Sequence, residues 1–277
     1  MVLQEFAPSY MLSDFIRTYR IVHFRFENFP ALPCKAYPPR PEHCLSFYPN
    51  DLEYVEYTES NKKAGGTRAV LFGQQTEVSN RFVGNNFLLF QVVFKAGALY
   101  RMTGIPSQEL TNLYIDAETI FSKEIKSINE RLSACGQYTQ MVAVVEAFLV
   151  NEIRLKSKAS SGIDLIMSSI FSKSTLPTVM NLAKDSCLSL RQYERLFKER
   201  MGVSPKYFLK VLRFENAFRM KNKYPNLDWL TVAFNCGYYD YQHLVKDYKD
   251  LTLKTPNEFH QIDLTAPERK FGMADTY

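Results

Sequence analysis

The chain has 277 residues, a formal net charge of +5, and ordinary fractions of hydrophobic (46%) and charged (23%) residues. This length suits two domains, and the composition is typical of a globular protein, not of a disordered or fibrous one. No run of eighteen apolar residues occurs, and the first residues lack the basic and apolar regions of a secretory signal. We therefore expect a cytoplasmic protein without a membrane partner.

The first hundred residues show the period-two pattern of β-strands. Segments rich in aromatic and branched residues alternate with Pro-rich, Asn-Asp and Gly-Gly sequences that favour turns. The predicted strands are 19–27, 44–48, 53–58, 67–72 and 87–95. Short strands at this spacing favour an antiparallel β-barrel or jelly roll.

Histidines and cysteines give no sign of a metal site or of catalysis. The histidines are His23, His43, His243 and His260, and no two of them form a His-x-His pair. We therefore expect no metal, no cofactor, no catalytic residue and no enzymatic activity. Glu42 beside His43 is expected to be a surface or strand-edge pair. The five cysteines are scattered, which indicates reduced, mostly buried thiols.

From residue 122 the hydrophobic period becomes helical. Two helices are predicted at 122–135 and 137–156. The second helix carries an apolar stripe, formed by Met141, Val144, Val145, Phe148 and Leu149. This stripe either packs on the barrel, which is the simpler interpretation, or forms the seam of a homodimer.

The small, polar segment 157–162 is typical of a linker between domains. We therefore expect an N-terminal domain at 1–156 and a C-terminal helical domain at 163–277. The sequence thus predicts an α+β protein with two domains.

A helix-turn-helix motif is predicted at about 176–201, here called the first motif. Its first helix spans 176–184, with Pro177 in the first turn. Its second helix is amphipathic and begins at Ser189, which forms a capping box with Gln192. In such motifs the second helix is suited to enter the major groove of DNA.

The pattern recurs at about 228–250, here called the second motif. A short apolar-faced helix begins near Trp229, and Asp240 caps the helix that follows. A helix from Ser204-Pro205 to about Lys221 joins the two motifs and spans roughly 27 Å. It can therefore hold two recognition helices near the ~34 Å spacing of successive major-groove faces.

The charge is unevenly distributed between the two motifs. Residues 161–223 hold twelve Lys and Arg and five Asp and Glu, a difference of +7. Residues 224–277 hold five and eight, a difference of −3. The first motif and the joining helix therefore carry the basic surface expected of a nucleic-acid-binding protein.

Residues 162–260 resemble the DNA-binding domain of AraC-type transcriptional regulators. In the first half the matching residues are Leu182, Ala183, Ser189, Tyr193, Arg195, Phe197, Lys198, Gly202, Ser204, Pro205, Tyr207, Arg213 and Ala217. In the second half they are Val232, Ala233, Gly237, Tyr238, Asp240, His243, Leu244, Tyr248, Lys249, Thr255 and Pro256. Two positions depart from the family pattern: Leu253 replaces a usual glycine, and His260 a common arginine.

The N-terminal part resembles the cupin-like sensor domain that precedes some of these DNA-binding domains. The resemblance rests on the segments VLFGQQTEV and VVFKAGALYRMTGIPSQELTN. It implies a small-molecule effector or homodimerisation through the barrel. The family resemblance also implies double-stranded DNA and RNA polymerase as partners, and it favours an activator.

The family pattern, carried over by position, implies the DNA contacts. Candidate base readers are Arg191, Glu194, Arg195, Tyr241, Gln242, Val245 and Lys246, and candidates for phosphate or backbone contacts are Gln192, Lys198 and Lys249. Arginine suits guanine, glutamine suits adenine, and valine suits the thymine methyl group. Arg213, flanked by apolar residues, is expected to clamp the two halves together and not to touch DNA.

Two other functions are compatible with the sequence. A small-molecule-binding or enzymatic barrel could carry a helical tail that contacts proteins, or the regulator could respond only to its own abundance. Salt-dependent duplex binding distinguishes the first of these from a transcription factor. The sequence leaves open the effector, the promoter, activation or repression, and the oligomeric state.

Overall fold

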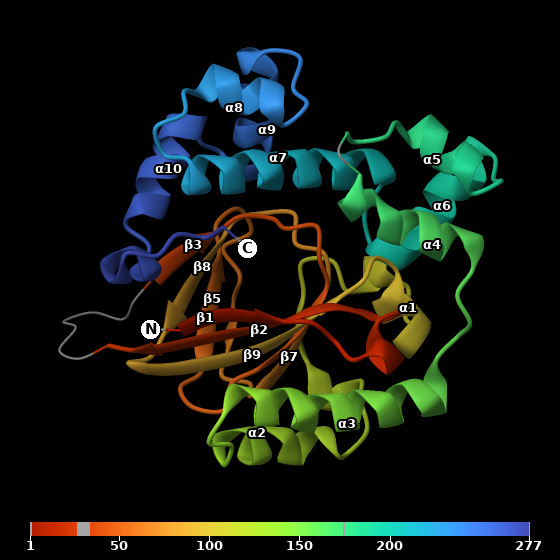
Figure 1. The fold of residues 1–277 in the computed structure, drawn as a ribbon, viewed down its shortest axis with the longest axis vertical. Helices are drawn as coiled ribbons and strands as arrows, with labels where there is room; N and C mark the ends of the chain where they lie inside the picture. The colour runs from red at the N-terminus through yellow and green to blue at the C-terminus, as the bar shows by residue number, and fades with distance from the viewer. Residues whose placement is uncertain (1, 27–33, 174, 277) are drawn as a thin grey trace.

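The computed structural model describes residues 2–26, 34–173 and 175–276. A β-rich N-terminal part is followed by a helical C-terminal part, which confirms the predicted α+β class (Figure 1). No helix in these ranges is both long and apolar enough to cross a membrane.

Two antiparallel sheets form the N-terminal part, and together they are called the barrel below. The larger sheet has the order β1 (Val2–Phe6), β2 (Ile16–Arg25), β9 (Asn86–Phe94), β4 (Cys44–Phe47), β7 (Ala69–Phe72) and β10 (Tyr114–Asp116). The smaller sheet has the order β3 (Cys34–Tyr37), β8 (Ser79–Val83), β5 (Glu53–Tyr57) and β6 (Lys63–Gly65). The five predicted strands correspond to β2, β4, β5, β7 and β9, although Glu27, the predicted end of the first, lies outside the described residues.

Helices cover the outer face of the larger sheet. They are α2 (Ile125–Ser133) and α3 (Tyr138–Lys156), which run side by side in Figure 1. Along the α3 stripe, Met141, Val145, Phe148 and Leu149 are fully buried in the same core as the strand residues Ile21 and Phe90, and Val144 is partly buried. The stripe therefore packs on the barrel, as the simpler of the two interpretations holds.

The C-terminal part consists of short helices around one long helix. They are α4 (Gly162–Ser169), α5 (Val179–Asp185), α6 (Leu190–Met201), α7 (Pro205–Lys223), α8 (Trp229–Asn235), α9 (Tyr241–Thr252) and α10 (Pro256–Leu264). Helix α5 begins three residues later than predicted. The reason is that Thr178, and not a residue before Pro177, caps it: Thr178 Oγ1 accepts a hydrogen bond from the Asn181 N–H.

Helix α7 connects two separate hydrophobic cores. Near its start, Phe208 packs with Tyr193 and Phe197 of α6 in the core of the first motif. Farther along, Phe214 packs with Tyr248 of α9, at 4.6 Å between ring centroids, in the core of the second motif. In Figure 1, α7 lies between the barrel and the second motif, whereas the first motif lies beside the N-terminal end of α7, next to α1 (Ala98–Thr103).

The helical part also contacts the barrel directly. Ser107 Oγ donates to the Arg200 carbonyl at the end of α6 (2.7 Å), and Tyr207 Oη donates to the Thr76 carbonyl (3.0 Å). His43, which directly precedes β4, also contacts α6: its Nε2 lies 3.3 Å from the Met201 carbonyl oxygen. The end of α6 and the start of α7 are therefore linked to the barrel.

Two expectations about burial were wrong. Glu42 and His43 are buried, not at the surface, because Arg17 and Arg20 pair with Glu42 while α6 covers His43. All five cysteines are free, but the thiols are not mostly buried. The buried ones are Cys44 and Cys236, the exposed ones Cys34 and Cys187, and Cys135 is intermediate.

Candidate nucleic-acid interface

Helix α6 has well-defined ends. At its start, the Gln192 N–H donates to Ser189 Oγ (3.3 Å), while Gln192 Oε1 accepts from the Ser189 N–H (3.2 Å) and hydroxyl (2.9 Å). At its end, Gly202 takes a left-handed conformation, with φ of 80°, and its N–H donates to the Lys198 carbonyl. These caps fix which side chains the helix presents.

The outer face of α6 is polar and open to solvent. Arg191, Glu194, Arg195 and Lys198 are all exposed, whereas the opposite face is buried in the core of the first motif. Gln192 is also exposed, but its side-chain oxygen belongs to the capping box. The structure thus brings the candidate residues of the first motif together on one accessible helix face.

Helix α9 presents a similar but less basic face. Asp240 caps it, since its Oδ1 accepts from the His243 N–H at 2.7 Å. Gln242, Lys246 and Lys249 are exposed, whereas Tyr241 and Val245 are half-buried. The candidate residues of the second motif therefore also lie near one another, at the start and outer side of α9.

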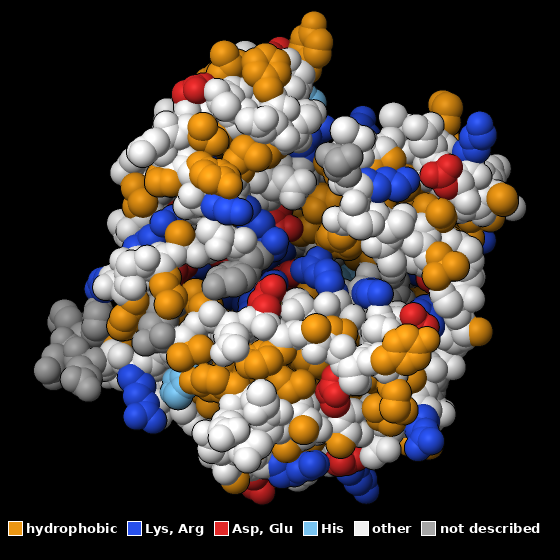
Figure 2. Space-filling view, viewed as in Figure 1, with side chains coloured by type: hydrophobic (Ala, Val, Ile, Leu, Met, Phe, Trp, Pro, Cys, Tyr) orange, Lys and Arg blue, Asp and Glu red, His pale blue; other side chains and the backbone are white. Residues whose placement is uncertain are grey.

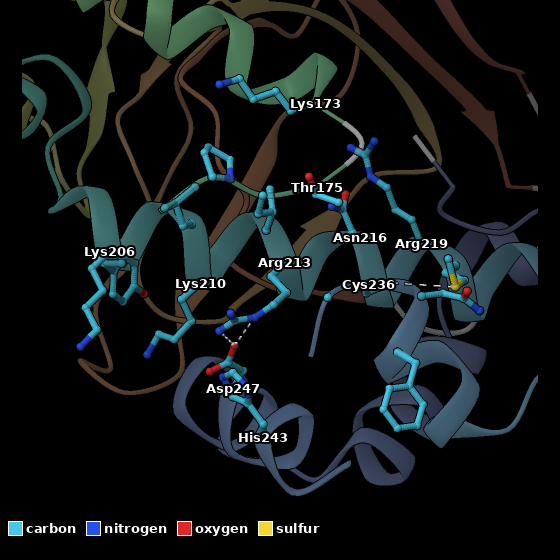
Figure 3. Close-up of a pocket in the computed structure, with 18 of the residues that line it drawn as sticks. Lys173, Thr175, Lys206, Lys210, Arg213, Asn216, Arg219, Cys236, His243 and Asp247 are labelled. Atoms are coloured by element: carbon cyan, nitrogen blue, oxygen red, sulfur yellow. Dashed lines mark hydrogen bonds and ion pairs between the residues drawn. The ribbon is translucent and has the colours of Figure 1, made fainter. Parts of the chain in front are cut away.

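Arg213 links α7 to α9. Its Nη2 and Nε donate to one carboxylate oxygen of the buried Asp247, at 2.6 and 3.2 Å (Figure 3). Its guanidinium also lies 4.7 Å from the ring centroid of Tyr238. An arginine that forms both contacts holds α9 at a fixed angle on α7. Its position supports the clamping role and leaves its charge largely neutralised.

A basic groove of about 1400 Å³ separates the two motifs along α7. Its cationic lining residues are Lys173, Lys206, Lys210, Arg213, Arg219, Lys223 and Lys246. Asp247, already paired with Arg213, and Asp250, 3.2 Å from Lys210, are the acidic residues that line it. In Figure 2, Lys and Arg side chains flank the hollow between the two groups of helices.

The groove adds residues that the sequence motifs did not identify. Lys206 and Lys210 project from the same side of α7 as Arg213, as Figure 3 shows. No sequence motif identifies them, because the spacing of residues within α7 does not show which face of this helix lines the groove between the two motifs. The available signal was the +7 balance of residues 161–223, which includes both lysines.

The chemistry of this region fits a polyanion. Lysine and arginine side chains around a groove neutralise phosphates, and one capped helix in each motif offers polar side chains for base edges. Among the described residues, no group of three or more His, Cys, Asp or Glu side chains could hold a metal ion.

Comparison with known families agrees with this geometry. Residues 182–262 match a family described as "Helix-turn-helix domain". The chain carries an AraC-type helix-turn-helix domain. It is therefore a DNA-binding transcriptional regulator. Residues 4–116 match a second family, described as "Domain of unknown function (DUF6597)". The sequence is not significantly similar to any curated protein.

Three solved structures are similar to the chain to different degrees. Apo ToxT from Vibrio cholerae is 9% identical over 88% of this chain and 97% of its own, with a TM-score of 0.50. ToxT with a bound unsaturated fatty acid is 9% identical over 93% and 96%, with a TM-score of 0.47. The AraC-like activator CuxR is 11% identical over 74% and 76%, with a TM-score of 0.28. At such low identity the first of these supports the fold alone.

Proposed function

We propose that the protein is a sequence-specific regulator that inserts α6 and α9 into successive major-groove faces of one DNA duplex. The observation that carries this proposal is the basic groove along α7, with an exposed, capped recognition helix in the motif on each side. Helix α7 has 19 residues and so spans about 28 Å, close to the ~34 Å between successive groove faces.

The roles of individual residues follow from position along each helix. Arg191, Glu194 and Arg195 lie in the first half of α6, where a recognition helix meets base edges. Lys198 lies a turn later, nearer the passing backbone. Lys206 and Lys210 in the groove are suited to phosphate contacts between the two sites.

The candidate residues of α9 take corresponding roles. Tyr241, Gln242, Val245 and Lys246 are proposed to read bases, and Lys249 to contact the backbone. The half-buried Tyr241 and Val245 suit contact with thymine methyl groups better than polar readout. The second motif is less basic than the first, so we expect the first to contribute more of the affinity.

The N-terminal barrel is proposed to control the DNA-binding part in response to a small molecule. A cavity of about 110 Å³ lies in the barrel, lined by apolar residues such as Phe24, Phe87 and Leu89 and by the cations Arg20 and Arg81. We also propose that the protein is cytoplasmic, contacts RNA polymerase and has no catalytic activity. The proposed boundaries are 1–156 for the sensor domain, 157–162 for the linker and 163–277 for the DNA-binding domain. A homodimer would need a surface other than the α3 stripe, which is buried.

The test compares two cations on α6. Arg195→Ala should weaken binding to a selected site by roughly 1–3 kcal/mol and weaken binding to a scrambled duplex much less, because it removes a base contact. Lys198→Ala should weaken both by a similar factor, because a phosphate contact carries no sequence information. Titrations of each variant against both duplexes measure the difference. Equal losses for Arg195→Ala would remove its role as a base reader.

A further inference from the structure

The C-terminal tail, residues 265–276, returns from the helical part to the barrel. In Figure 1 the C-terminus lies against the barrel beside β3 and β8. Pro267, Glu268 and Asp275 of the tail line the barrel cavity together with strand residues. The tail therefore occupies part of the space in which an effector would bind.

The tail supplies most of the negative charge in this cavity. The barrel contributes the cations Arg20, Lys35, Arg40 and Arg81 to the lining, and Glu53 as a carboxylate. The tail contributes Glu268 and Asp275, whose side chains are only 4% and 8% exposed. Without the tail, the lining would hold four cations and one carboxylate.

Two of these cations have partners in the tail. Lys35 Nζ donates to Asp275 Oδ2 at 2.7 Å and also pairs with Glu268, and Arg40 pairs with Asp275. By contrast, Arg20 and Arg81 pair inside the barrel, with Glu42 and Glu53. Burial alone would raise the pKa of Asp275, but the charges of Arg40 and Lys35 lower it well below its ordinary value, so the carboxylate is ionised here.

The tail also brings an aromatic ring to the barrel. The ring centroid of Phe271 lies 5.9 Å from that of Phe24 and 5.6 Å from that of Phe26. Phe24 lines the cavity. The tail thus presents a carboxylate to the cations and an apolar ring to the aromatic wall, as an amphipathic carboxylic acid would.

The same tail is tied to α7. Asn222 of α7 donates through Nδ2 to the Asp275 carbonyl (3.0 Å), and Arg269 donates to Asn222 Oδ1 (2.6 Å). Asn222 is buried, and its hydrogen bond to Asp275 is shielded from water, whereas the one from Arg269 is only partly so. A tail that leaves the cavity would therefore also release a connection between the barrel and the helix that joins the two motifs.

We propose that the C-terminal tail is a built-in occupant of the effector site, displaced by a small molecule that carries a carboxylate and an apolar body. This inference rests on the proposed function of the barrel as a sensor. The remaining volume of about 110 Å³ is well below the ~300–1000 Å³ of ordinary ligand pockets, so a ligand of useful size must displace the tail. Its carboxylate takes Lys35 and Arg40 from Asp275, and the tail detaches from α7.

The first experiment measures hydrogen exchange of the full-length protein. Asp275→Asn should speed exchange of the tail amides by at least about tenfold, because a buried charge pair is lost. Glu118→Gln, which removes an exposed pair with Lys126, is the matched control and should leave the tail unchanged. Lys35→Gln breaks the contact from the barrel side and should reproduce the effect. Tail exchange at the wild-type rate in both variants would overturn the proposal.

The second experiment uses 3-phenylpropionate as the probe and 3-phenyl-1-propanol as its neutral analogue. Calorimetry should show that the acid binds Asp275→Asn at least about tenfold more tightly than wild type, because it no longer competes with the tail. Wild-type protein saturated with the acid should show the fast tail exchange, and the alcohol should not produce it. Equal affinity for both proteins, or binding with the tail still protected, would contradict the competition.

Neither readout involves DNA, so the two proposals can fail separately. If the wild-type protein does not bind duplex DNA, the proposed function is contradicted, but the hydrogen-exchange and calorimetry results still test the role of the tail. Normal duplex binding together with a tail that does not respond to Asp275→Asn or to the acid would contradict only the tail's role.

Discussion

At the scale of single residues, the sequence predicted the surface of α6 better than its contacts with the barrel. Periodicity separated the buried Tyr193 and Phe197 from the exposed Arg191 and Arg195, because a single amphipathic helix has one buried face. It could not predict that His43 is buried. The burial of His43 depends on the contact between the end of α6 and the start of β4, which are far apart in the sequence.

His43 should make stability depend on pH in the mildly acidic range. Burial lowers its pKa from 6.5 to about 4, since the charged form would be desolvated beneath α6. Between these values the unfolded chain binds a proton that the folded protein does not, so the free energy of unfolding falls as the pH drops from about 6.5 to about 4. The loss should be on the order of 3 kcal/mol.

Urea unfolding followed by circular dichroism from pH 7 to pH 4 measures this dependence. The variant His43→Gln keeps a side-chain donor but cannot take up a proton, so it should lose less stability over the same range. Other titrating groups affect wild type and variant alike, so the difference isolates His43. Identical pH profiles would show that His43 does not titrate in this way.

Among the helices and strands, the ends of the two recognition helices were predictable from the sequence. Both α6 and α9 end in a left-handed residue, Gly202 with φ of 80° and Leu253 with φ of 59°. The departure from glycine at Leu253 is therefore accommodated by strain and not by a different turn. Strands β3 and β8 escaped prediction because buried and exposed residues do not alternate along them, whereas they do along β5 of the same sheet, which was predicted.

Substitutions at the two helix ends should have opposite effects on the stability of the protein. Leu253→Gly should stabilise the protein, by up to about 1 kcal/mol, because glycine adopts this backbone freely and the leucine side chain is exposed. Gly202→Ala should destabilise it, since its Cβ would lie 2.4 Å from Thr111 Oγ1 and 2.8 Å from the Ser107 oxygen. Thermal unfolding measures both. A lower midpoint for Leu253→Gly would contradict the strain assigned to α9.

At the scale of the whole molecule, the order of parts was predictable but their docking was not. Composition and periodicity predicted a β-barrel followed by two helix-turn-helix motifs, because each depends on local spacing. The return of Asp275 to Lys35 and Arg40 joins residues more than 230 positions apart. No periodic pattern records such a contact, and the groove along α7 likewise depends on how two folded motifs face one another.

Binding of duplex DNA by the groove and by helices α6 and α9 is the proposal on which the residue roles depend. If the wild-type protein makes about six phosphate contacts, a plot of log K against log salt concentration should have a slope near −5. The double variant Lys206→Ala/Lys210→Ala should make this slope shallower by about 2, while Lys126→Ala, at an exposed site on α2, should leave it unchanged. Fluorescence-anisotropy titrations of the full-length proteins at several salt concentrations give these slopes. A wild-type slope near zero would contradict the account.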